Sequence, residues 1–249
     1  MLEKVSTILK MADESNTAVI SFICTDYNMV YSVVTTAEKT NTPALVMLLP
    51  EHYEKNNTMN VHGFAEMVKE LAESVKVPIG LHLDHSYDYD SVITSIKKGF
   101  DSVMIDASAY SLDENIALTR KVTETAHILG ADVEAEIGRV GGAEGDYKAV
   151  DIALTSVEEA KCFAEETKVD ALAVAIGTAH GNYKETPKLR IDRLKEIAAE
   201  NGKRGPGQKI SFAKRITKYW HFAIEHAAKH EACPSAAELI SHFEKSTHR

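Results

Sequence analysis

The chain has 249 residues, of which 44% are hydrophobic, so it can bury a full single-domain core. Its formal net charge of −9 at pH 7 argues against nucleic acid as a partner, because binding phosphates needs a basic surface. Neither a membrane-spanning apolar run nor a secretory signal occurs, so we expect a cytoplasmic protein without a membrane partner. The three scattered cysteines support neither disulfides nor a thiolate metal site.

Aliphatic runs alternate with amphipathic segments along most of the chain. The runs predict strands over residues 18–23, 44–48, 79–83, 102–105, 132–137 and 171–176. The segments between them predict helices over residues 30–39, 61–74, 89–98, 112–129 and 156–166. This alternation predicts an α/β fold with a parallel sheet, either open and doubly wound or part of a TIM-type (β/α)8 barrel. Polar residues at the strand ends favour the barrel, with strands seven and eight missing or doubtful.

The composition changes near Gly202. Residues 202–249 hold nine Lys and Arg against four Asp and Glu, a net charge of +5, whereas residues 1–201 carry −14. We therefore predict a barrel body over 1–201 and a basic tail over 202–249. Apolar residues at helical spacing from Phe212 to Ala227, and an N-cap pattern at Pro234-Ser235-Ala236-Ala237-Glu238, predict two amphipathic helices in this tail. Residues 209–212 are a candidate remnant of a seventh strand.

Histidines and carboxylates gather at the ends of the third and fifth predicted strands. By the two-residue period of a strand, His82 and Asp84 share one face, and His85 begins the following loop. Glu134 and Glu136 both face the barrel interior. Two inward carboxylates are costly to bury unless cations or a metal compensate them.

Three more candidates follow other aliphatic runs. Asp106 is either the N-cap of the next helix or a group that orients a metal ligand. Residues 138–144 predict a flexible glycine-rich loop that ends in Glu144, which alone would suggest an ordinary surface loop. His180, with His85 and the carboxylates, indicates a metal site that still needs a third ligand besides the two histidines.

In this order, the motifs resemble the class II, metal-dependent aldolases of carbohydrate metabolism, which act on ketose bisphosphates. The resemblance runs from about Thr17 to Leu194 and implies cleavage to dihydroxyacetone phosphate and an aldehyde phosphate, as in glycolysis, by a homo-oligomer (a dimer or tetramer). It rests on Leu81-His82-Leu83-Asp84-His85, Ser102-Val103-Met104-Ile105-Asp106, Val133-Glu134-Ala135-Glu136-Ile137-Gly138 with Gly141-Gly142-Ala143-Glu144, and the segment from Asp170 to Tyr183 that contains Gly177-Thr178-Ala179-His180-Gly181.

The resemblance also implies a role for each matching position around a catalytic zinc ion. His85 and His180 match zinc ligands, and Asp106 and Glu136 match carboxylates near an alternative position of the metal. The zinc would polarise the substrate carbonyl and stabilise the enediolate.

The remaining matches concern proton transfer and phosphate. Asp84 matches the acid/base that serves the hydroxyl at the breaking bond, and Glu144 matches the group that exchanges the carbon-bound proton. Gly181 and Lys184 mark the expected phosphate site, where a monovalent cation would assist.

The chain also departs from the family pattern. The seventh-strand His-Gly-Gly-Ser-Gly sequence, which supplies the third zinc histidine, does not occur, and neither does the eighth-strand motif. Ile23 stands where the family commonly has Asn. Three functions remain open: a zinc-dependent aldolase, impaired unless another ligand replaces the missing one; a non-catalytic sugar-phosphate-binding or regulatory subunit; and another metal-dependent lyase or isomerase.

Overall fold

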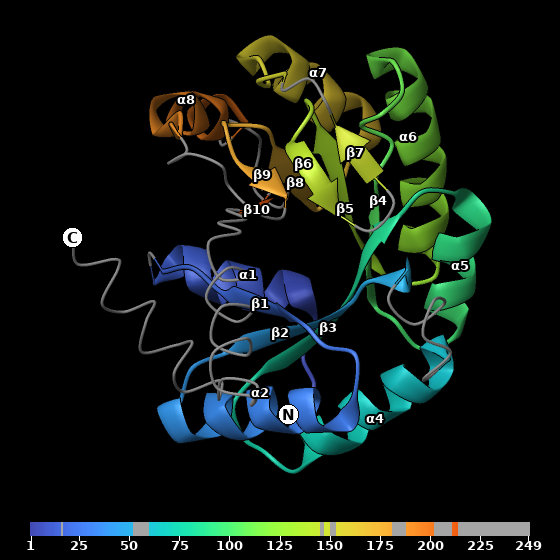
Figure 1. Ribbon diagram of the computed structural model, residues 1–249, viewed down its shortest axis with the longest axis vertical. Coiled ribbons are helices and arrows are strands. Elements are labelled where there is room, and N and C mark those ends of the chain that lie inside the picture. Colours follow the sequence, from blue (N-terminus) through green and yellow to red (C-terminus); the bar gives the residue numbers. More distant parts are fainter. Residues whose placement is uncertain are drawn as a thin grey trace.

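A curled parallel sheet forms the centre of the molecule (Figure 1). The computed structural model describes residues 1–15, 17–51, 60–144, 147–149, 153–180, 188–201 and 211–213. The main sheet has seven strands in the order β1-β2-β3-β4-β5-β8-β10, and a smaller sheet has the order β7-β6-β9. The helices that follow the strands lie on the outer side of the main sheet, as in a TIM-type barrel (Figure 1).

The six predicted strands are confirmed, and neighbouring strands are parallel. A short seventh strand lies in the tail and pairs with β8, from Ser211 opposite Ala171 to Ala213 opposite Ala173. It includes residues 211 and 212 of the predicted remnant, and residues 209 and 210 lie outside the described part. The strands of the main sheet are β1 Ile20–Ile23, β2 Ala44–Leu48, β3 Ile79–Ser86, β4 Ser102–Ile105, β5 Asp132–Ile137, β8 Ala171–Val174 and β10 Ser211–Ala213. Because β1 and β10 stand at the two ends of the order, the described strands form an incomplete barrel.

All five predicted helices are present, and the described part of the chain also contains α1 and α8, which were not predicted. The helices are α1 Val5–Glu14, α2 Tyr27–Thr40, α4 Val61–Glu73, α5 Tyr89–Lys97, α6 Leu112–Ile128, α7 Val157–Thr167 and α8 Ile191–Asn201. Five of them begin with a side chain that accepts a hydrogen bond from a free N–H of the first turn, namely Asp26, Asn60, Asp88, Ser111 and Ser156. Each of these caps follows a strand, so the capped helices begin at the rim formed by the strands' carboxyl ends.

The main core lies between the outer face of the sheet and these helices. Phe64, Phe100 and Phe163 are among its largest fully buried side chains, and they pack with aliphatic residues of the strands. This apolar layer fixes which strand residues face outward. The alternate residues must then face the inside of the barrel, where the polar candidates lie.

Helix α1 contacts β3 and β10. Its Val5 and Ile8 pack with Leu45 in a second apolar cluster. The Ser6 amide donates to the Asp132 carboxylate over 2.9 Å, and Asp132 is the first residue of β5. These contacts place α1 at the amino ends of the strands, opposite the rim where the catalytic candidates are found.

Among the described helices, none is long and apolar enough to cross a bilayer. The two helices predicted for the tail lie outside the described residues. The division into a body over 1–201 and a separate tail therefore stays a prediction.

Candidate active site

A bulge near the end of β3 brings His85 into the barrel. Leu83 pairs with Val103 and Ser86 pairs with Ile105, so β3 uses one more residue than β4 between these pairs. An extra residue interrupts the alternation of faces and lets adjacent side chains turn to the same side. Asp84 and His85 are accordingly both buried. The prediction that His85 begins a loop was wrong, because pairing with β4 continues through Ser86.

Three buried side chains from successive strands form a candidate metal centre. His85 of β3, Asp106 after β4 and Glu136 of β5 each offer a ligand atom, and these atoms lie within 4.8 Å of one another. One imidazole nitrogen and two carboxylates form a donor set that suits zinc, although zinc binding normally uses a further protein ligand. Both carboxylates are almost fully buried, which is costly without a nearby cation.

Asp106 holds the imidazole of His85 from one side. Its Oδ2 lies 2.9 Å from His85 Nδ1, and its Oδ1 accepts a hydrogen bond from the Ser108 amide over 3.0 Å. Burial alone would raise the pKa of Asp106, but the hydrogen bonds from His85 and Ser108 outweigh it and leave this pKa below its usual value. A proton on Nδ1 directed to Asp106 leaves Nε2 of His85 with a lone pair for a metal. Asp106 is not a helix N-cap, because Ser111 caps α6.

Glu136 is supported from helix α6. The buried Asn115 amide donates to the Glu136 carbonyl over 2.9 Å, and its own oxygen accepts a hydrogen bond from the Thr119 hydroxyl over 3.0 Å. These contacts anchor the backbone of β5 at the residue whose carboxylate joins the metal cluster. Asn115 was not among the sequence candidates, because an Asn inside a helical pattern looks like an ordinary surface residue.

A second polar group lies on the same three strands, nearer to their amino ends. His82 Nδ1 is 2.8 Å from the Ser102 hydroxyl, and His82 Nε2 is 3.4 Å from Glu134 Oε2. This contact confirms that Glu134 faces the barrel interior with His82. His82 is thus a polar neighbour of this inward carboxylate.

Residues 141–144 of the predicted glycine-rich loop form a strand of a β-hairpin. Its strands β6 Gly141–Glu144 and β7 Tyr147–Ala149 are antiparallel, and β6 also pairs in parallel with β9 Ala179–His180. Gly142 lies opposite His180. The small sheet therefore brings the backbone that carries Glu144 beside the backbone that carries His180, across the carboxyl ends of β5 and β8 (Figure 1).

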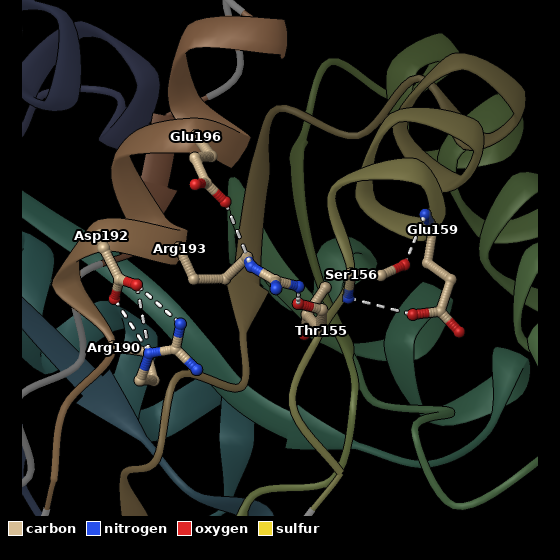
Figure 2. Close-up of polar contacts among 7 residues, drawn as sticks. All are labelled: Thr155, Ser156, Glu159, Arg190, Asp192, Arg193 and Glu196. Atoms are coloured by element: carbon tan, nitrogen blue, oxygen red, sulfur yellow. Dashed lines mark hydrogen bonds and ion pairs between the residues drawn. The ribbon is translucent and has the colours of Figure 1, made fainter.

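The structure thus joins some of the predicted site residues and not others. It brings His85, Asp106 and Glu136 together and buries Asp84 nearby on β3. For Glu144 and His180 the structure gives the position of the backbone in β6 and β9. Gly181 and Lys184 lie outside the described residues. Sequence analysis missed Thr155 and Arg193, which link the loops next to this site (Figure 2).

Comparison with known proteins shows the family of the chain. The family model described as fructose-bisphosphate aldolase class-II matches residues 3–205. The chain belongs to this family. A fructose-bisphosphate aldolase from Thermus caldophilus is 39% identical over 198 residues, which cover 77% of this chain and 63% of that protein. A sulfofructosephosphate aldolase from Alkalicoccus urumqiensis is 34% identical, over 77% of this chain and 67% of that protein.

Solved structures extend the likeness to the fold. The YdjI aldolase from Escherichia coli K12 has a TM-score of 0.74 at 25% identity and covers 96% of this chain and 90% of its own. A fructose-bisphosphate aldolase from Campylobacter jejuni has a TM-score of 0.65 at 19% identity and supports the fold alone. The match to the Thermus caldophilus protein spans less than two thirds of that relative's length.

Proposed function

We propose that the chain is a zinc-dependent aldolase that cleaves or forms a ketose 1,6-bisphosphate. The observation that carries this proposal is the buried group of His85, Asp106 and Glu136 in a chain of the class II aldolase family. It lies at the carboxyl ends of parallel strands, where TIM-type barrels place their active sites. The proposal includes a cytoplasmic location and a homo-oligomer, a dimer or tetramer.

The donor chemistry at this site fits zinc. His85 and His180 would hold the ion, and Asp106 and Glu136 would balance its charge and hold it in an alternative position. When bound, zinc supplies a Lewis acid that polarises the substrate carbonyl and stabilises the negative charge of the enediolate. The bulge in β3 and the Asp106 contact keep His85 directed inward for this role.

The chain's own residues would move the protons. Asp84, adjacent to His85, would take the proton from the substrate hydroxyl as the carbon–carbon bond breaks. Glu144, on the hairpin beside β9, would return a proton to the carbon of the dihydroxyacetone phosphate half. Backbone amides near Gly181, with Lys184 and a monovalent cation, would bind a substrate phosphate.

The ketose itself stays open, because relatives of similar identity carry the names of fructose-bisphosphate and sulfofructosephosphate aldolases. The first experiment is therefore cleavage by the purified chain of fructose 1,6-bisphosphate, tagatose 1,6-bisphosphate and sulfofructose phosphate. Product analysis and metal content are measured on the same preparation, with a chelator control. Activity that the chelator abolishes and zinc restores is the expected result.

Two variants test the assigned roles. Asp84→Ala should abolish cleavage and leave zinc bound, because it removes the proton acceptor and no proposed ligand. His180→Ala should lose both zinc and cleavage. Retained cleavage in either variant would contradict the assignment. The alternative of a non-catalytic sugar-phosphate-binding subunit is favoured by the missing seventh-strand histidine, and folded, zinc-free protein without cleavage would support it.

A further inference from the structure

Thr155 connects the ends of two barrel strands that lead to different parts of the active site. It is 1% exposed and lies directly before helix α7. Its hydroxyl donates to the Ile137 carbonyl over 2.8 Å and accepts a hydrogen bond from the Ala175 amide over 2.9 Å. Ile137 ends β5, and Ala175 follows the last residue of β8. One side chain therefore bridges the two strands where their pairing ends.

The backbone of Thr155 is held on both sides as well. Its N–H donates to the Ala175 carbonyl over 3.0 Å, and its carbonyl accepts a hydrogen bond from Arg193 Nη1 of α8 over 3.2 Å. The next residue, Ser156, forms a reciprocal capping box with Glu159 (Figure 2). Every polar group of Thr155 is thus engaged, and the start of α7 fixes its position.

The strands diverge immediately after this bridge. The backbone turns at Gly138, with φ +82°, into the hairpin that carries Glu144, and at Gly177, with φ +98°, into the strand that carries His180. A Cβ on Gly138 would lie 2.6 Å from the Thr155 hydroxyl oxygen, and one on Gly177 would lie 2.6 Å from the Lys188 carbonyl oxygen. Both turns are therefore packed tightly against neighbouring segments.

Hydrogen bonds from the start of α8 complete the connection between the end of β8 and Thr155. The Arg190 amide donates to the Ile176 carbonyl over 2.8 Å, and the side chain of Arg190 pairs with Asp192 on the first turn of α8 (Figure 2). Three residues after Arg190, the side chain of Arg193 donates a hydrogen bond to the Thr155 carbonyl. These contacts join the ends of β5 and β8, from which the chain continues into the small sheet where Gly142 pairs with His180.

We propose that Thr155 is a positioning residue: its hydroxyl sets the spacing between the ends of β5 and β8 and so holds the hairpin of Glu144 against the strand of His180. This inference rests on the proposed function, in which Glu144 transfers a proton and His180 binds zinc. Misplacement of reacting groups by about 1 Å can lower a rate about 100-fold, so a spacing contact outside the metal cluster can control turnover.

Thr155→Val tests the hydroxyl, because valine keeps the shape and removes both side-chain hydrogen bonds. The variant should fold, because the Ala175 amide can still donate a hydrogen bond to the Ile137 carbonyl over 3.3 Å. Thr155→Ser restores the hydroxyl. Thr167→Val is the matched control: Thr167 is equally buried, at 1% exposure, and its hydroxyl bonds only within α7, to the Phe163 carbonyl.

The first measurement is amide hydrogen exchange, which does not depend on activity. Thr155→Val should speed exchange about tenfold or more at Ala175 and in residues 139–144, 147–149 and 176–180, because these segments lose a local anchor. Thr155→Ser and Thr167→Val should exchange there like the wild type. Unchanged exchange in Thr155→Val, or an equal change in Thr155→Ser, would overturn the proposal.

The second measurement is the steady-state kinetics of the zinc-loaded protein. In Thr155→Val kcat should fall about 10- to 100-fold while KM stays nearly constant, and Thr155→Ser should recover most of the loss. A loss of kcat no greater than that of Thr167→Val would reduce Thr155 to a structural role and overturn the proposal. If the wild type cleaves no ketose bisphosphate, the proposed function fails, and the exchange experiment still decides whether Thr155 holds the two segments.

Discussion

Gly138 and Gly130 adopt nearly the same left-handed backbone, with φ +82° and +79°, in different surroundings. A Cβ on Gly138 would meet three atoms within 2.8 Å, whereas one on Gly130 would meet nothing within 4 Å. We expect Gly130→Ala to cost about 1 kcal/mol from backbone strain, and Gly138→Ala about 2–4 kcal/mol because overpacking is added. Urea unfolding of both variants measures the difference in stability. Equal losses of unfolding free energy would show that the atoms around Gly138 move to make room for the added methyl group.

Asp101, which precedes β4, is a partly buried residue whose carboxyl has a raised pKa. Burial and the nearby Asp132 carboxylate raise the pKa of Asp101 from 3.8 to about 6. The folded protein therefore holds this proton more tightly than the unfolded chain. Stability should fall as the pH rises through the window between the two values, and the penalty is complete above about pH 6.

Asp101→Asn removes this penalty, because the amide stays neutral. At pH 7 the variant should be more stable than the wild type by about 1 kcal/mol, after allowance for the part of the carboxyl that solvent screens. Unfolding free energies measured from pH 4 to 7 provide the check. The gain should be small at pH 4 and grow toward pH 6, and a gain that does not change with pH would contradict the assigned cause.

For single residues, the sequence predicts which residues belong to the site better than which way their side chains face. Alternation along the fifth strand correctly places Glu134 and Glu136 on the inner face, where Glu134 meets His82. The same rule fails for His85, because it assumes a regular strand and the bulge is not visible in the sequence. Thr155 also leaves no signal, since a Thr before a helix start looks like a capping residue.

Helices α6 and α7 both begin with a capping box, formed by Ser111 with Glu114 and by Ser156 with Glu159. Replacing either serine by alanine should cost about 1 kcal/mol of stability, because one N–H of the first turn loses its acceptor. Ser156→Ala should also lower kcat, since Ser156 follows Thr155, whereas Asn60→Ala, which removes the equivalent cap of α4, serves as the matched control. Thermal unfolding and turnover of the two variants would test this, and an equal effect of both on kcat would contradict it.

Among the elements, those with strong local signals are predicted and those that depend on distant partners are not. The five predicted helices have apolar spacing and capping residues, whereas Lys4, before α1, gives no side-chain cap. The hairpin of β6 and β7 was predicted as a loop because its glycines disfavour strands. It forms against β9, a segment more than thirty residues away in the sequence.

For the molecule as a whole, the parallel sheet brings distant motifs to one rim. His85, Asp106 and Glu136 come from three successive strands and meet because parallel strands end on the same side. The tail adds β10 beside β8, so the described sheet has seven strands and β1 remains at the other end of the order. Pattern analysis could place this rim, because the alternation of strands and helices fixes where the strands end.

A metal ion at this rim should stabilise the entire fold, because it would tie β3, β5 and the segments after β4 and β8 together. Zinc at 100 times its Kd adds about 2.7 kcal/mol if it binds only the folded chain. For a chain of this size that corresponds to a rise in Tm of about 5–10 °C. Thermal unfolding with increasing zinc measures the rise, and magnesium at the same concentration should produce little, since it prefers a shell of oxygen ligands.

Two histidine variants decide whether the effect arises at the proposed site. His85→Ala should remove the zinc-dependent rise in Tm, because it deletes the imidazole that Asp106 orients. His127→Ala should keep it, because His127 is a surface residue of α6 that contacts Asp170, at the start of β8 on the opposite end of the barrel. A rise that survives in His85→Ala would place the zinc elsewhere. Its absence in the wild type would mean that the available donors do not replace the family's missing histidine.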